Sequence, residues 1–292
     1  MISVQDAFLG FKKKLELTKT ESGDAQKRHK EVRNSVRESF GVDRDFLTGS
    51  YARHTKTKPL KDIDVFFVLD DSESWRRDKP PIETLNAFER CLRNSFDTVE
   101  PNRRCITVEF DKVYQTNEDG GKVLSVDAVP AFSNNNGFEI PDRILGKWVK
   151  TDPEVHASQA TNKNKELDQN WKPLVKMLKK WNAEAGKPIK PSFLIEVMAQ
   201  ELIDSPFATY ADELINFFSA AQDSISDDWA DPAGLGPAVS DQMDIQMQQA
   251  AREKLRHAER MADRAMRAED LGNTNEALSL WREIFGPYFP IR

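Results

Sequence analysis

Apolar residues at helical spacing mark the start of this chain. They recur three or four positions apart at Val4, Phe8, Phe11 and Leu15, and again at Val32, Val36 and Phe40. Residues on such a spacing share one face of a helix. We therefore predict helix from about Ser3 to Phe40, ended by Gly41, because glycine is common just past a helix C-terminus.

The middle of the chain has the pattern of a β-sheet. Ile63–Leu69 is a nearly continuous apolar, β-prone run, which predicts a buried central strand. We predict two further strands at Cys105–Phe110 and Val123–Val129, with a turn at Asn117–Gly121 between them. An amphipathic helix is predicted at Ile82–Phe96.

Helical periodicity returns from Trp148 to the end of the chain. Helices are predicted at Asn170–Ala185, Ser192–Leu202, Tyr210–Gln222, about Asp241–Leu271, and Asn275–Phe285. The pattern predicts an α+β protein with a mixed α/β lobe at residues 41–147 and a helical lobe at 148–292. An N-terminal helical segment, residues 1–40, is expected to pack across both lobes.

The charge and composition of the chain indicate which classes of binding partner to expect. The 42 Lys and Arg residues are outnumbered by 48 Asp and Glu, which gives a net charge of -6. The chain therefore lacks the basic surplus of proteins that hold nucleic acid stably. Its two cysteines, Cys91 and Cys105, lack metal-ligand spacing, and the N-terminus has no long apolar run. We expect a cytoplasmic protein with no membrane span.

Two acids open the predicted central strand. Asp62 and Asp64 are two residues apart, so in a strand they point to the same face. Carboxylates this close repel each other, and a cation between them relieves the repulsion. Hard oxygen ligands favour Mg²⁺ or Mn²⁺ over zinc. Upstream, Gly49 and Ser50 lie at a predicted turn, where backbone N–H groups and a hydroxyl can hold phosphate oxygens.

A third acid, Asp127, interrupts the apolar pattern of a later strand. An unpaired charge inside such a strand is costly. If this strand neighbours the one with Asp62 and Asp64, the three carboxylates can hold two ions about 3.5–4 Å apart, an arrangement suited to in-line phosphoryl displacement. Alone, an Asp-x-Asp pair is more often a solvated strand edge. Together with Gly-Ser before it and a later strand Asp, it favours catalysis.

The segment from Leu47 to Leu69 resembles the nucleotidyltransferase superfamily of DNA polymerase β type. The signature of that superfamily is a Gly-Ser, a short spacer, an Asp-x-Asp strand and a later Asp. Further motifs resemble one branch, and they are Ile140-Pro141-Asp142, Trp148, Thr151-Asp152-Pro153, His156, Leu178-Lys179-Lys180-Trp181, Pro191-Ser192-Phe193, Glu196 and the ending from Trp281 to Phe289. This branch is the CD-NTases of anti-phage CBASS systems, bacterial enzymes related to cyclic GMP-AMP synthase and oligoadenylate synthase.

The resemblance implies a polymerase-β-like catalytic lobe, an oligoadenylate-synthase-like helical lobe, and an active site in the cleft between them. It implies that Asp62, Asp64 and Asp127 are catalytic and bind two Mg²⁺ or Mn²⁺ ions. The nucleotide-binding residues it implies are Gly49, Ser50, Lys176, Lys179 and Ser192. The lysines lie in a lysine-rich helix, where most are solvated, and Ser192 is also a candidate helix N-cap.

The resemblance also implies a reaction. Ribonucleoside triphosphates, with ATP expected among them, would be joined into a cyclic second messenger with release of pyrophosphate. A regulatory CBASS protein is an expected partner, and stable binding of double-stranded DNA is not expected. The alternatives are linear oligonucleotide synthesis, nucleotidyl transfer to RNA or protein, and, from another class, an inactive nucleotide-binding scaffold. The sequence leaves the bases, ring size and linkage open.

Overall fold

The computed structural model describes residues 2–58, 60–114 and 122–292, so the predicted turn at Asn117–Gly121 lies outside the described residues. The chain divides into two compact units. The sheet unit is residues 17–157, and the helical unit is residues 1–16 with 158–292. The sequence placed boundaries at 40/41 and 147/148, whereas these units meet at 16/17 and 157/158.

The predicted single helix from Ser3 to Phe40 is in fact two helices, α1 (Val4–Leu15) and α2 (Lys19–Ser39). Thr18 restarts the helix as an N-cap. Its hydroxyl accepts from the backbone N–H of Glu21 at 3.2 Å, and the Glu21 carboxylate accepts from the Thr18 N–H at 2.7 Å. This reciprocal capping box satisfies two N–H groups that a helix start leaves unpaired.

Seven strands in the described residues form one mixed sheet, as predicted. They are β1 (Val42–Thr48), β2 (Asp62–Leu69), β3 (Thr98–Pro101), β4 (Ile106–Tyr114), β5 (Lys122–Asn134), β6 (Gly137–Asp142) and β7 (Lys147–Thr151). The order is β1-β2-β5-β4-β3, and β6 pairs with both β5 and β7. Trp148 therefore lies in a strand, which corrects the helical periodicity predicted to begin there.

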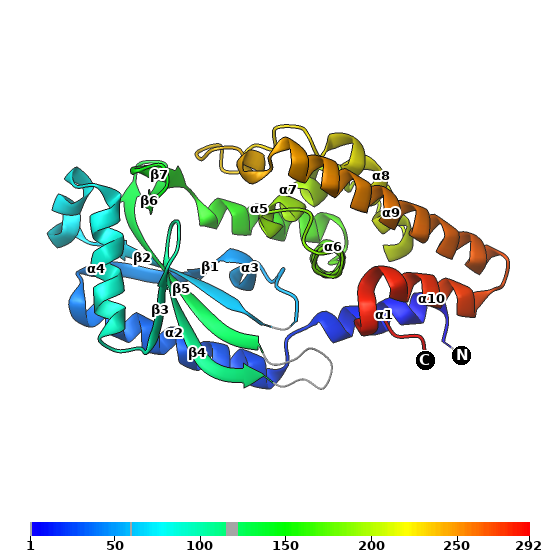
Figure 1. Cartoon of the computed structure of the whole chain (residues 1–292), viewed down its shortest axis with the longest axis horizontal. Helices are drawn as coiled ribbons and strands as arrows, with labels where there is room; N and C mark the ends of the chain where they lie inside the picture. Colours follow the sequence, from blue (N-terminus) through cyan, green and yellow to red (C-terminus); the bar gives the residue numbers. More distant parts are fainter. Residues whose placement is uncertain (1, 59, 115–121) are drawn as a thin grey trace. The chain divides into compact units, whose positions relative to one another are not determined.

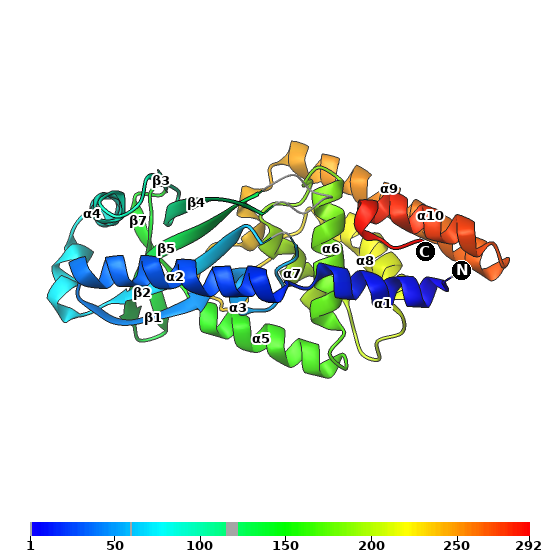
Figure 2. The ribbon, with the colours of Figure 1, turned by 90° about the horizontal axis from the view of Figure 1, so that it is seen from below.

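Two helices cover one face of this sheet. Apolar residues of α2 and α4 (Pro81–Arg93) share a core with residues of β2, β4 and β5. Figures 1 and 2 show α2, in blue, running along the strands. Two shorter helices also belong to the sheet unit, α3 (Gly49–Ala52) and the 3₁₀ helix η1 (Asp71–Asp78). The face away from α2 and α4 is thus the one available for chemistry.

The helical unit is built around an aromatic core. Its elements after α1 are α6 (Trp171–Glu184), α7 (Ser192–Leu202), α8 (Tyr210–Ser224), η2 (Val239–Gln242), α9 (Ile245–Asp270), α10 (Thr274–Phe285) and η3 (Gly286–Tyr288). Between the units in sequence, α5 (Pro153–Glu166) begins in one and ends in the other. Phe11 of α1 packs in the same core as Trp281 and Phe285, which is why α1 belongs here. No described helix is long and apolar enough to cross a membrane.

Candidate active site

Adjacent parallel strands bring the three predicted acids together. β2 and β5 pair in parallel, with Asp64 opposite Asp127 and Asp62 opposite Ser125. All three acids come from neighbouring positions of the same sheet, as the sequence predicted if the strands were neighbours. All three are half-buried. The structure therefore assembles the acids in one place, and their catalytic role stays a prediction.

Strand alternation sets which face carries the acids. Ile63 and Val65 of β2 lie in the core beneath α2 and α4, and so does Val126 of β5. Side chains one position along point to the opposite face. Asp64 and Asp127 therefore lie on the face that α2 and α4 leave uncovered.

Gly49 allows the backbone to pass close to Asp64. β1 pairs with β2 so that Thr48 lies opposite Asp64, and the chain then turns into α3. Gly49 has a φ of +63°, and a Cβ added there would lie 1.7 Å from Oδ2 of Asp64. Only glycine fits this position, both for its φ and for its lack of a side chain. The predicted Gly-Ser motif thus lies directly against one of the acids, with Ser50 next to it in α3.

The acid cluster is electrostatically unbalanced. The pKa of Asp127 is raised from its ordinary 3.8 to about 7, first by burial and then by the neighbouring charge of Asp64. Asp62 adds to this shift, while a hydrogen bond from Thr107 opposes it. A buried carboxylate beside like charges disfavours its own ionised form. The raised pKa shows that the protein alone does not fully compensate these charges.

Two side chains offset part of this imbalance. The ammonium of Lys56 contacts Oδ1 of Asp62, and the Thr107 hydroxyl donates to Oδ1 of Asp127. Cys105 is close by, and burial together with Asp127 and Asp64 raises the pKa of its thiol well above the usual range. The thiol is therefore neutral at physiological pH and adds no further negative charge.

The donor set fits a hard divalent cation. Three carboxylates lie on one sheet face, and the pKa of Asp127 is raised by burial and then by repulsion from its neighbours. A bound Mg²⁺ or Mn²⁺ ion would relieve this repulsion. Among the residues that the structure describes, no group of three His, Cys, Asp or Glu side chains is already arranged around a metal position. Asp62 is engaged by Lys56 instead. Metal binding would therefore require Asp62 to exchange this contact.

The other predicted nucleotide-binding residues belong to the helical unit. Lys176 and Lys179 of α6 are buried, and each forms an ion pair of 2.6 Å, Lys176 with Glu16 and Lys179 with Glu196. The expectation that most lysines of this helix are solvated is therefore wrong for these two. Ser192 is exposed and is the first residue of α7, whose N-cap is Pro191, and no side chain caps this helix.

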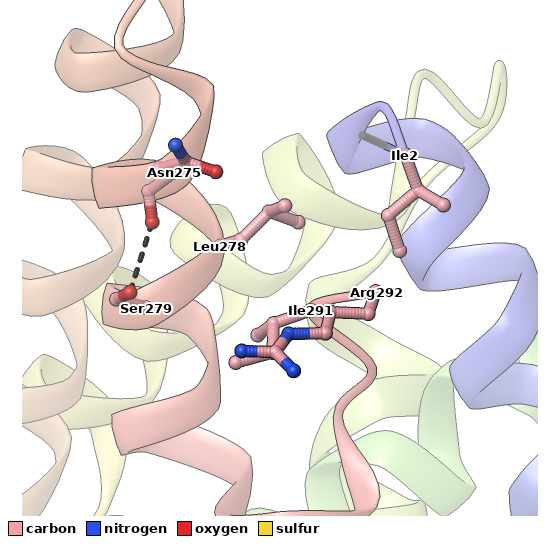
Figure 3. Close-up of a pocket in the computed structure, with 6 residues that line it drawn as sticks. All are labelled: Ile2, Asn275, Leu278, Ser279, Ile291 and Arg292. Carbon is pink, nitrogen blue, oxygen red and sulfur yellow. Dashed lines mark hydrogen bonds between the residues drawn. The ribbon is translucent and has the colours of Figure 1, made fainter.

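A separate pocket of the helical unit lacks the chemistry of a catalytic site. It has a volume of about 470 Å³ and is lined by Ile2, Asn275, Leu278, Ser279, Ile291 and Arg292 (Figure 3). Arg292 is the only charged residue among these six. None of these six side chains is a carboxylate that could bind a cation, so the acid cluster of the sheet unit remains the candidate active site.

Nothing in the sequence singled out Asn102, Thr107 or Lys56 as members of the site. Lys56 stands among several polar residues before β2, and nothing in their spacing separates it from the others. Thr107 is significant because β4 pairs with β5 so that Thr107 lies opposite Asp127. Strand pairing of this kind is not visible in one sequence.

Comparison with protein families gives one match that covers more than half of the chain. Residues 2–164 match the model described as the Second Messenger Oligonucleotide or Dinucleotide Synthetase domain. This range contains β1, β2 and β5 and hence all three acids. One relative is the cyclic AMP-AMP-AMP synthase of Acinetobacter sp. (strain ATCC 27244 / 9458), which is 25% identical over 99% of this chain and 86% of its own length.

Solved structures show the same fold. The chain matches CdnC of E. coli MS115-1 in its complex with HORMA-deltaN at a TM-score of 0.73, with 20% identity over 98% of each chain. It matches the structure of the same protein with ATP at a TM-score of 0.73, with 19% identity over 99% of each chain. The similarity spans both units, so the sheet unit and the helical unit occur together in these relatives.

Proposed function

The chain belongs to the Second Messenger Oligonucleotide or Dinucleotide Synthetase family, and we propose that its acid cluster joins ribonucleoside triphosphates into a cyclic oligonucleotide of CBASS signalling. Family membership confirms the predicted resemblance and the predicted enzyme class, a nucleotidyltransferase that makes second messengers. The observation that supports the proposed site best is the parallel pairing that sets Asp64 opposite Asp127. The reaction would release one pyrophosphate for each linkage.

Asp62, Asp64 and Asp127 would hold two Mg²⁺ or Mn²⁺ ions. When bound, such ions lower the pKa of an attacking hydroxyl and neutralise charge on the triphosphate. Gly49 and Ser50 would bind the donor triphosphate, since Gly49 lies directly against the carboxylate of Asp64. Lys176, Lys179 and Ser192 remain proposed triphosphate contacts.

The chain's own residues would position the reactants and manage the proton. Attack of a ribose hydroxyl on the α-phosphate of a second nucleotide forms one P–O bond and breaks the bond to pyrophosphate. The hydroxyl proton must leave, and Asp127, which lies beside Asp64 in the acid cluster, is the proposed group that helps to remove it. A second attack within the linear product would close the ring. Catalysis would come from orientation and charge compensation rather than from a covalent enzyme intermediate.

The relatives suggest which nucleotide and which partner to examine first. One relative is named a cyclic AMP-AMP-AMP synthase, and the E. coli structures contain ATP or a HORMA protein. We propose ATP as a substrate and a regulatory protein of the HORMA type as a partner. The cytoplasm is the proposed location.

Product analysis tests the function. The purified protein is incubated with the four ribonucleoside triphosphates and Mg²⁺ or Mn²⁺, with and without a HORMA protein, and pyrophosphate is measured. Products that survive phosphatase are identified by chromatography and mass spectrometry. The Asp62→Asn/Asp64→Asn variant serves as the control for the acid cluster, and its circular dichroism must match that of the wild type.

Each outcome selects one function. A phosphatase-resistant cyclic product that the double variant cannot make supports the proposal. A product with a free end that phosphatase trims indicates linear synthesis. Nucleotide binding without pyrophosphate release under every condition, unchanged by the double substitution, would contradict the enzyme and favour the scaffold.

A further inference from the structure

Asp127 lies in a row of three residues that crosses the sheet. On one side its partner in β2 is Asp64, and on the other its partner in β4 is Thr107. Pairing in register puts all three side chains on the same face of the sheet. One neighbour of Asp127 is therefore a carboxylate that repels it, and the other is a hydroxyl that can donate to it.

The direction of donation is fixed by a second residue. The side-chain amide of Asn102 donates to Oγ1 of Thr107 at 2.6 Å, and the Thr107 hydroxyl donates to Oδ1 of Asp127. A threonine hydroxyl has a single proton. Because Oγ1 accepts from Asn102, that proton is available for Asp127. We call this chain of two hydrogen bonds the Asn102–Thr107 relay.

The surroundings hold the relay in place. Thr107 is nine-tenths buried, so water does not readily substitute for its hydroxyl. The backbone N–H of Asn102 donates to the carbonyl of Cys105 at 2.9 Å, which closes the turn before β4 and positions the Asn102 side chain. A buried hydrogen bond to an ionised carboxylate is stronger than one between neutral groups. The contact with Thr107 therefore favours one orientation of the Asp127 carboxylate over others.

We propose that Asn102 and Thr107 are positioning residues that orient Asp127 for metal binding and for attack by the ribose hydroxyl. This inference rests on the proposed function, because it assigns the relay to the reaction that Asp127 would serve. Oδ1 accepts the hydrogen bond from Thr107, which restricts rotation of the carboxylate, and the neighbouring Cys105 thiol also hydrogen-bonds to Asp127. The relay would act through Asp127 rather than by direct contact with nucleotide or metal.

Substitutions of Thr107 that distinguish the effect of its hydroxyl from the effect of its side-chain packing test the relay. Thr107→Val keeps the shape and removes the hydroxyl, whereas Thr107→Ser keeps the hydroxyl. Thr84→Val is the matched control, because the Thr84 hydroxyl is also buried in the sheet unit but has no hydrogen-bond partner. We expect kcat to fall about tenfold or more in Thr107→Val, in line with loss of a charge-assisted hydrogen bond. We expect the KM for ATP to stay within about twofold, kcat of Thr107→Ser within about threefold, and Thr84→Val at wild-type activity.

A double-mutant cycle tests whether Asn102 acts through Thr107. Asn102→Ala alone should lower kcat about threefold, and it should add nothing in the Thr107→Val background, because the residue it directs is already absent. Full additivity, equal losses in Thr107→Val and Thr107→Ser, or wild-type kcat in Thr107→Val would each overturn the proposal.

Mn²⁺ affinity, measured by calorimetry without turnover, gives an independent readout. It should weaken in Thr107→Val and remain at the wild-type value in Thr84→Val. If the wild type makes no oligonucleotide, the proposed function fails, while the Mn²⁺ affinities of the same variants still decide whether the relay orients Asp127. Equal affinities in the wild type and Thr107→Val would reject it.

Discussion

Asp64 and Asp127 are backbone partners on adjacent parallel strands, and neither carboxylate is far from the other's charge. Burial raises the pKa of Asp127 most, and the charge of its neighbour Asp64 raises it further. Two partly buried carboxylates side by side in a sheet are energetically unfavourable in the absence of a cation. Such an arrangement is typical of a site whose charges are balanced by a ligand.

Substitution of Asp127 should therefore stabilise the metal-free protein at high pH. The folded-state pKa of about 7 lies above the ordinary 3.8, so the folded protein holds this proton over a range where the unfolded chain has lost it. The contribution of this proton to the stability of the wild type is fully present below about pH 4 and is lost as the pH rises through about 7. Asp127→Asn removes this loss, which we expect to be on the order of 4 kcal/mol.

Urea unfolding in EDTA at pH 5 and pH 8 measures this difference. Relative to the wild type, the free energy of unfolding of Asp127→Asn should be higher at pH 8 than at pH 5. The variant should also lose Mn²⁺ binding. If the difference in unfolding free energy between the wild type and Asp127→Asn is the same at both pH values, the raised pKa is ruled out.

Gly49 should tolerate no side chain. Gly49→Ala places a methyl group 1.7 Å from Oδ2 of Asp64 and imposes strain at a φ of +63°. We expect product formation to fall at least about a hundredfold, since even small misplacement of reacting groups has effects of this size. The matched control is Gly23→Ala in α2, where an added Cβ meets nothing within 4 Å. It should leave activity intact and raise stability by about 0.5–1 kcal/mol. Thermal unfolding and pyrophosphate release of both variants provide the comparison, and an active Gly49→Ala enzyme would contradict the close approach.

The acids could be predicted from sequence because their pattern is local. Asp62 and Asp64 stand at the start of a strand that is recognisable from its long apolar run. Because side chains two positions apart in a strand point to the same face, the two acids were expected to lie together. Asp127 could be identified because an unpaired carboxylate inside an apolar strand is energetically unfavourable and therefore suggests a functional role. The sequence left open whether the two strands are neighbours, and the parallel pairing of β2 and β5 shows that they are.

Features that depend on pairing or on distant contacts could not be predicted. Thr107 looks like any strand threonine until β4 is placed beside β5. Lys179 looks like a solvated helix lysine, yet its ammonium is buried against Glu196, seventeen positions away. The break between α1 and α2 was locally readable from Thr18 and Glu21, but the longer apolar periodicity obscured it.

Lys56 should compete with metal for Asp62. Its ammonium contacts Asp62 in the structure and lowers the charge imbalance of the cluster. Removing it in Lys56→Met should make the metal-free protein less stable and its Mn²⁺ affinity several-fold higher, because the metal no longer displaces an ammonium. Thermal unfolding with EDTA and with a Mn²⁺ titration measures both effects. Weaker Mn²⁺ binding in Lys56→Met would show instead that Lys56 supports the metal site.

The buried pair of Lys179 and Glu196 allows a structural role to be separated from nucleotide binding. Both side chains are nearly inaccessible, with exposed fractions of 7% and 3%, and their charged atoms lie 2.6 Å apart. Removing one partner of such a pair costs about 3–5 kcal/mol, because the remaining charge loses its compensation. Lys179→Met should therefore be strongly destabilising. Lys176→Met is the comparison, because its partner Glu16 is half-exposed and keeps contact with water, so the loss should be clearly smaller.

The double variant Lys179→Met/Glu196→Gln then decides the role of Lys179. It removes both charges, so it should recover much of the stability lost in Lys179→Met. If Lys179 binds the triphosphate, the double variant should fold normally yet show a KM for ATP raised about tenfold or more, because the lost contact is to the substrate. If Lys179 serves only the fold, recovery of stability should bring recovery of KM. Unfolding free energies and steady-state kinetics on the same preparations distinguish the two, and a stable double variant with wild-type KM would remove Lys179 from the nucleotide site.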